Sequence, residues 1–190
     1  MKNIYKLTII LFISLLFVKC SKENQFLIGK NRVGVISNQH TIADIDELYS
    51  KDSLVVRLSE GELGGEDTKY IQEDDKYLVY SKEGKHLVTI VPKKQHDSTS
   101  QIKYVEVMDS QFKTEKNVSL QTPFKEINLN YMINKVETSL SSATLYIDEL
   151  NATLSMRKKD IGVNEYSQQK VVLEQIPDLA KINHFTIWFD

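Results

Sequence analysis

Cysteine, proline and glycine are all scarce in this sequence. Its 190 residues include one Cys, three Pro and seven Gly. A single thiol cannot form an internal disulfide, so the fold must depend on a hydrophobic core. The low Pro and Gly content argues against long disordered linkers, and 41% hydrophobic residues are ordinary for a globular chain. The composition therefore predicts a globular protein without disulfide bonds.

An excess of basic residues is also missing. The whole chain carries a formal net charge of −2. Leaving out residues 1–19, which hold Lys2, Lys6 and Lys19 and no acidic residue, leaves 21 of the 24 Lys and Arg against all 26 Asp and Glu, a net charge of −5. Nucleic-acid binding proteins carry a basic stripe or patch. We therefore expect no nucleic-acid partner.

The most informative segment that is present lies at the N-terminus. Lys2 and Lys6 precede an almost wholly apolar run from Leu7 to Val18. As a helix this run would span roughly 18 Å, which is too short for a hydrocarbon core of about 30 Å. A basic start followed by a short apolar run is typical of a secretory signal peptide. We predict that residues 1–19 are a signal peptide; a short uncleaved anchor is the alternative.

The only cysteine, Cys20, directly follows this segment. Leu15 to Cys20 resembles the signal of bacterial lipoproteins, with Phe17 and Lys19 where that family has Leu and a small residue. The resemblance implies that Cys20 is lipidated, by palmitate among other acyl chains, and that residues 20–25 are a polar tether. Ser21 in place of Asp resembles the signal for the outer membrane. The expected location is the cell envelope, anchored in the outer membrane; an ordinary signal peptide cut near Cys20 is the alternative.

Beyond residue 25 the sequence predicts an α+β fold built from antiparallel sheet and two short helices. The apolar spacing is helical in Thr41–Tyr49 and Thr122–Tyr131, where each Thr is expected to cap the helix. A hairpin and a final alternating strand follow each helix. The hairpins are Tyr77–Val91, turning at Glu83-Gly84, and Ala143–Arg157, turning near Leu150-Asn151; the final strands are Ile102–Met108 and Ile182–Trp188; and the lead-in strands are Phe26–Ile36 and Phe112–Leu120.

This order of elements indicates two tandem helix-plus-sheet repeats, at residues 26–109 and 110–190, with chance similarity as the alternative. The layout resembles that of the beta-lactamase-inhibitor-protein type, in which tandem helix-plus-sheet units form one saddle. It is also similar to that of small outer-membrane assembly lipoproteins, which carry a single such unit. The first resemblance implies that a sheet face binds protein partners.

Sequence motifs for catalysis are absent. His40, His86, His96 and His184 are scattered, and there is no HExxH zinc motif, no G-x-S-x-G nucleophile motif and no phosphate-binding loop. We therefore expect no enzyme, no cofactor and no metal. The alternative is an envelope hydrolase or metal-dependent enzyme whose site is assembled only by the fold.

The densest acidic stretch is Glu60–Asp67. Calcium prefers several carboxylate and carbonyl oxygens, so this composition is suggestive of a calcium loop. The stretch lacks the spacing of the known calcium loop, however, and a solvated connection is the simpler interpretation.

Strand alternation gives the best lead to a binding site. If Val105, Val107, Phe185 and Ile187 face the helices, the intervening side chains share the opposite face, together with Thr144 and Tyr146 of the second hairpin. Tyr, Trp and Met are favoured in protein interfaces. The predicted partner-binding face contains Tyr104, Glu106, Met108, Tyr146, His184, Thr186 and Trp188. The alternative is that other segments cover this face as a second core. The function expected is that of a lipid-anchored protein-binding module, of the inhibitor, immunity or envelope-assembly type.

Overall fold

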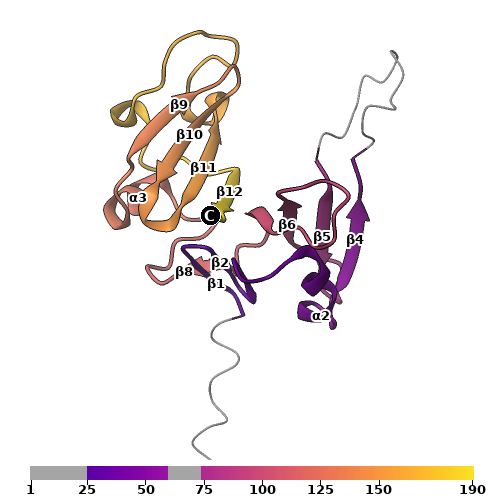
Figure 1. Ribbon diagram of the computed structural model, residues 1–190. Coiled ribbons are helices and arrows are strands. Elements are labelled where there is room, and N and C mark those ends of the chain that lie inside the picture. The colour runs from indigo at the N-terminus through magenta and orange to yellow at the C-terminus, as the bar shows by residue number, and fades with distance from the viewer. Residues whose placement is uncertain (1–24, 60–73) are drawn as a thin grey trace, which may run out of the picture.

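The computed structural model describes residues 25–59 and 74–190 (Figure 1). The predicted signal peptide, Cys20 and the acidic stretch Glu60–Asp67 lie outside the described residues. Within the described residues the fold is α+β, mostly antiparallel sheet with two short α-helices, which confirms the predicted class.

The strands form one large and one small sheet. The large sheet has eight strands in the order β4-β5-β6-β7-β12-β11-β10-β9, and every neighbouring pair in it is antiparallel. Its strands are β4 (Ser53–Arg57), β5 (Lys76–Tyr80), β6 (His86–Pro92), β7 (Ile102–Val107), β9 (Lys135–Thr138), β10 (Ser142–Ile147), β11 (Ala152–Arg157) and β12 (His184–Trp188). The small sheet has the order β3-β2-β1-β8, with β1 (Leu27–Gly29), β2 (Arg32–Val33), β3 (Ile36–Ser37) and β8 (Lys113–Thr114).

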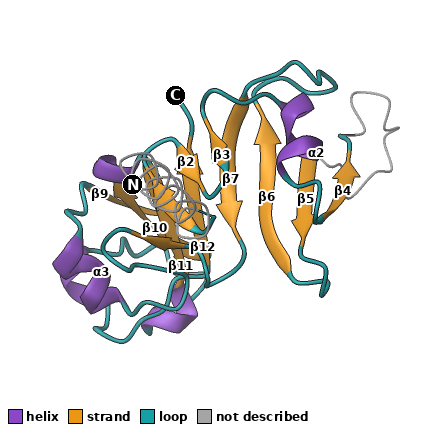
Figure 2. Cartoon of the chain, turned by 90° about the horizontal axis from the view of Figure 1, so that it is seen from below, coloured by secondary structure: helices purple, strands orange, loops and turns teal. Residues whose placement is uncertain are grey.

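The large sheet is symmetric in its strand order. In each half a helix is followed by four antiparallel strands, and the last strand of each half, β7 or β12, lies at the centre. The two halves therefore share one continuous sheet, joined where Phe185 lies opposite Val107 and Ile187 opposite Val105. Helix α2 (Ile45–Leu48) lies near β4 and β5, and α3 (Phe124–Asn130) near β9 and β10, at opposite ends of the sheet (Figure 2). The matched order is that expected of a duplication, although the repeat boundaries themselves stay a prediction.

The hairpin turns lie where the sequence places them. Gly84 has φ +78° between β5 and β6, and Asn151 has φ +49° between β10 and β11. Both values fall in the left-handed region that glycine and asparagine tolerate best. These residues therefore reverse the chain between the two strands of each hairpin with little backbone strain.

The two helix starts differ from one another. Thr41 precedes a 3₁₀ turn (Ile42–Asp44) that leads into α2 and forms a capping box with Asp44, whose carboxylate accepts the Thr41 backbone N–H at 2.7 Å and the Thr41 hydroxyl at 2.9 Å. Thr122 does not cap α3, because its hydroxyl oxygen accepts from the N–H of Ser119. The first N–H groups of α3 instead donate to the Ala180 and Asp178 carbonyls. A segment distant in sequence satisfies these donors, which helical spacing could not indicate.

The lead-in strands are also shorter than predicted. Phe26–Ile36 contains the short strands β1 and β2 and reaches the start of β3, because Asn31 and Gly34 both have positive φ and reverse the chain. Phe112–Leu120 contains only β8, which pairs in parallel with β1 through Ile28 and Thr114. The small sheet therefore ties the start of the described chain to the connection between the two halves (Figure 1).

One hydrophobic core lies beneath the large sheet. Its members come from the 3₁₀ turn and α2 (Ile42, Ile45), from α3 (Phe124, Ile127) and from the core-facing side chains of the strands, among them Val105, Leu145, Leu154, Phe185 and Ile187. Burying each such side chain contributes on the order of 1.5–3 kcal/mol. Both helices are too short to be stable alone and depend on this packing.

Burial differs between the halves on the other side of the sheet. In β10, β11 and β12 every second side chain is buried, and the intervening ones are half-buried or exposed. In β6, by contrast, all residues after His86 are buried, and the middle of β5 is buried on both sides. The sheet is therefore covered on both sides over β5 and β6, uncovered on one face over β7 and the second half, and largely exposed at the edge strand β4.

Candidate functional site

The uncovered face is built from alternate residues of five neighbouring strands. We define it as the open face; its side chains are half-buried or exposed. It comprises Tyr104, Glu106, Lys135, Glu137, Thr144, Tyr146, Thr153, Ser155, His184, Thr186 and Trp188.

Strand register brings six of the seven predicted residues onto this face. Thr186 lies opposite Glu106, and Trp188 lies opposite Tyr104. Thr153 pairs with both Thr186 and Tyr146, so Tyr146 belongs to the same row, two strands from Thr186. In the described chain these six side chains are half-buried or exposed, which favours an open face over a second core.

Met108 is the seventh predicted residue. It follows the last residue of β7 directly and is 41% exposed. It therefore lies at the border of the open face, beyond the paired strands.

An aromatic pair occupies one end of the two central strands. The rings of Tyr104 and Trp188 are 4.9 Å apart between centroids and tilted by 53°. The indole Nε1 of Trp188 donates to the Thr153 hydroxyl at 3.0 Å. Burial raises the pKa of the Tyr104 hydroxyl. The pair is held in place by its own contacts, which leaves the outer surfaces of both rings to meet another molecule.

A charged pair lies beside these rings. The Nδ1 atom of His184 is 2.5 Å from Oε1 of Glu106. This hydrogen bond raises the pKa of His184 above its ordinary value, against the opposing effect of burial. The pair favours a protonated imidazole on the open face at mildly acidic pH.

A second charged cluster lies on the outer strands of the face. Glu137 accepts hydrogen bonds from the Lys135 ammonium and from the Tyr146 hydroxyl at 2.5 Å, and these two bonds lower its pKa in that order. The same bond to Glu137 raises the pKa of Tyr146. The hydrogen bond of its hydroxyl to Glu137 therefore fixes the position of the Tyr146 ring.

Sequence reasoning missed several members of this face. Thr153 and Ser155 lie on β11, where they alternate with the buried residues Ala152, Leu154 and Met156. The same alternation test that selected Tyr104 and Trp188 would have found them. Lys135 and Glu137 lie on a four-residue edge strand, which is too short to give a clear pattern.

The only serine, histidine and aspartate that converge lie elsewhere in the described chain. Ser59 Oγ is 3.0 Å from Nε2 of His96 and 2.9 Å from Oδ1 of Asp75. In a catalytic triad the carboxylate bonds His Nδ1 and the serine proton passes to His Nε2. Here the serine hydroxyl donates to the carboxylate itself, and His96 Nδ1 is 4.0 Å from it.

Asp75 is the centre of this group and is fully buried. Its carboxylate also accepts the backbone N–H groups of Ser59 and His96. Burial opposes ionisation, but these hydrogen bonds outweigh it and lower the pKa of Asp75. We interpret the group as a clasp that joins the end of β4, the start of β5 and the loop after β6. The His96 side chain is half-exposed and takes part in this clasp.

Metal-binding geometry is not found in residues 25–59 and 74–190, where no three His, Cys, Asp or Glu side chains gather closely enough to hold an ion. His40 bonds to Ser37, and His86 stacks on Tyr80. In the same parts of the chain no helix is long and apolar enough to cross a membrane.

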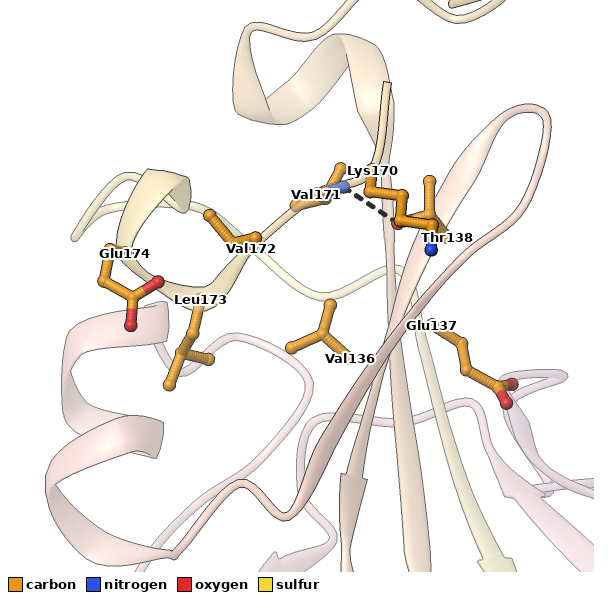
Figure 3. Close-up of a pocket in the computed structure, with 8 residues that line it drawn as sticks. All are labelled: Val136, Glu137, Thr138, Lys170, Val171, Val172, Leu173 and Glu174. Carbon is orange, nitrogen blue, oxygen red and sulfur yellow. Dashed lines mark hydrogen bonds between the residues drawn. The ribbon is translucent and has the colours of Figure 1, made fainter. Parts of the chain in front are cut away.

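A cavity of about 470 Å³ lies along the outer edge of β9, lined by Val136, Glu137, Thr138 and residues 170–174 (Figure 3). The segment 170–174 is held to the strand by the Val171 N–H, which donates to the Thr138 hydroxyl at 2.9 Å. Figure 3 shows Val136 and Leu173 turned toward each other and Glu137 pointing away. This lining is largely apolar and brings no acid–base pair together.

Comparison with known proteins adds little to this picture. No protein-family model matches the chain, and no curated protein matches its sequence. Among solved structures it is similar to the uncharacterized protein yfeY from Escherichia coli, with 11% sequence identity and a TM-score of 0.49, over 86% of this chain and 99% of that one.

Proposed function

We propose that this protein is an exported lipoprotein of the bacterial cell envelope that binds another protein through its open face. Cys20 carries the lipid, residues 21–25 form the tether, and the described domain stands at the surface of the outer membrane. The protein performs no catalysis and needs no cofactor. Its role belongs to the inhibitor, immunity or envelope-assembly type.

The observation that carries the proposal is an uncovered sheet face with a preset aromatic pair at one end of β7 and β12. Tyr104, Trp188, Glu106 and His184 lie on these two strands, at the border between the open face and the covered first half. Residues that dominate the binding energy of an interface are enriched in Trp and Tyr. Each aromatic side chain that already has a fixed position spares about 0.5–1.5 kcal/mol of ordering cost on binding.

The charged side chains of the open face pair with one another. Lys135 and Glu137 pair on β9, and His184 pairs with Glu106. Opposite charges that satisfy one another give little long-range attraction. Recognition therefore depends on shape and on aromatic contact more than on charge.

The anchor is tested by metabolic labelling. Cells given a fatty-acid analogue should incorporate it into the wild-type chain and not into Cys20→Ala. Equal labelling of both would remove the lipoprotein half of the proposal and leave the face untouched.

The face is tested by photo-crosslinking in cells. A photoreactive amino acid at Thr186, on the open face, should give a discrete adduct with another protein. The control is the same amino acid at Tyr166, which is 79% exposed and belongs to no strand of the large sheet. An equal adduct pattern from both positions, or no adduct from Thr186, would contradict binding through this face.

A further inference from the structure

Lys158 is a buried lysine at the end of β11. The residue is only 1% exposed, although it begins the 3₁₀ turn Lys158–Ile161 and is followed by the exposed Lys159. Its backbone N–H donates to the Ser141 carbonyl at 2.9 Å. A buried ammonium is expensive unless it is paired and hydrogen-bonded.

The ammonium of Lys158 is short of acceptors. It has three N–H donors, and its hydrogen bond is to the Ser167 carbonyl at 2.7 Å. Within the described ranges no Asp or Glu oxygen lies within 4 Å of it, whereas Lys159 pairs with Glu165. Its positive charge therefore has no counter-charge in this part of the chain.

A cavity of about 360 Å³ is lined in part by Lys158. Both partners of the Lys158–Ser167 hydrogen bond line it, and so does a second lysine, Lys170. The remaining lining residues are Thr138, Ser139, Leu140 and Gln168. Thr138 and Lys170 also border the cavity of Figure 3, so the two hollows adjoin at the end of β9. Ammonium, hydroxyl and amide groups are all donors to an anion.

We propose that this cavity binds a small oxyanion, the carboxylate or phosphate group of a ligand, through Lys158 and Lys170. An oxyanion accepts the free N–H groups of Lys158 and supplies the missing counter-charge. The neighbouring hydroxyl and amide groups complete its coordination. This site is separate from the open face and goes beyond the function proposed above.

The test uses the mature chain without its lipid and two probes, inorganic phosphate and succinate, at constant ionic strength with chloride as the reference. Either probe should shift the backbone amide NMR signals of Ser167 and Gln168 in a saturable manner. Lys158→Met keeps the length of the side chain and removes its charge, and should weaken binding at least about tenfold. Lys159→Met, on the adjacent exposed residue, should leave the affinity unchanged.

A second variant guards against misfolding of the first. Lys170→Gln alters an exposed residue at the border of the cavity and should weaken binding roughly two- to fivefold without changing the fold. Saturation by phosphate alone or by succinate alone supports the site and identifies its preferred oxyanion. No saturable shift with either probe, or equal affinity in wild type, Lys158→Met and Lys170→Gln, would overturn it. Trp188 variants should bind both probes as wild type does, whether or not the open face binds a protein.

Discussion

The two halves of the large sheet share a strand order but differ in what lies over them. In the first half β6 is buried on both sides, and Val91 and Thr89, which continue the rows of Tyr104 and Glu106, are buried. In the second half the equivalent side chains of β10 to β12 remain half-buried or exposed. One sheet therefore serves as core on both sides at β5 and β6 and presents a surface at β7 and in the second half. The open face is the part of the sheet in which buried side chains alternate with half-buried or exposed ones.

The largest expected effect on stability comes from the core residues that join the two halves of the large sheet. Phe185 is fully buried and lies opposite Val107, across the boundary between the two halves. Phe185→Ala should lower the free energy of unfolding by about 3–5 kcal/mol. Because the halves share one core, Trp188 fluorescence and far-ultraviolet circular dichroism should report one urea transition in wild type and variant. Two separated transitions would mean that the halves are independent domains.

The next prediction compares a buried position in the first half with a half-buried position on the open face. Val91 lies on the side of β6 that continues the open face, and it is buried. Val91→Asn places an amide there and should lower the free energy of unfolding by about 3 kcal/mol. Ser155→Asn, on β11 in the open face, should change the unfolding free energy by less than about 0.5 kcal/mol. Urea denaturation measures both. Equal costs would show that both halves are covered alike.

The clasp in the first half gives a smaller effect. Asp75→Asn removes a buried carboxylate that accepts three hydrogen bonds, and should cost about 1–3 kcal/mol. The matched control is Asp160→Asn in the second half, an exposed carboxylate bonded to Arg157, which should have little effect.

The pH dependence of this clasp follows from the lowered pKa of Asp75. Its contribution is present above the unfolded pKa near 3.9 and is lost as the pH falls through the lower folded pKa. The thermal midpoints of wild type and Asp75→Asn should therefore converge toward pH 2. A constant difference from pH 7 to pH 2 would contradict the ionised clasp.

The smallest effect lies on the open face. The pKa of His184 is raised, so its pairing with Glu106 contributes stability below the unfolded pKa near 6.5 and loses it as the pH rises through the folded pKa. His184→Gln should have a slightly lower thermal midpoint than wild type at pH 5.5 and the same midpoint at pH 8.5. The difference should vanish in a Glu106→Gln background. A difference that grows toward pH 8.5 would exclude this pairing.

Much of the fold could be predicted from local sequence patterns. Gly84 and Asn151 mark the hairpin turns because they tolerate left-handed backbone, and the alternation of Tyr104–Val107 and His184–Ile187 identifies the strands that carry the open face. The contrast between the halves also has a sequence signal, because Leu87–Val91 is apolar except for Thr89, as is typical of a strand buried on both sides.

Long-range contacts were not readable. The small sheet depends on β1 pairing with β8, more than 80 residues later in the chain, and α3 is capped by carbonyls of Asp178 and Ala180. The burial of Lys158 has no local sequence signal, since the next residue is also lysine and is exposed. Periodicity reports which side of an element is buried; it does not report which distant segment covers it.

The account rests on the open face as the binding surface, and the affinity of the purified mature chain for the protein crosslinked from Thr186 tests this most directly. Isothermal titration of wild type, Trp188→Ala and Tyr166→Ala against that protein would supply the comparison. Binding through the open face predicts a loss of about 30-fold or more for Trp188→Ala, as for an aromatic residue that dominates an interface, and a change within about twofold for Tyr166→Ala. Undiminished affinity in a folded Trp188→Ala variant would contradict it.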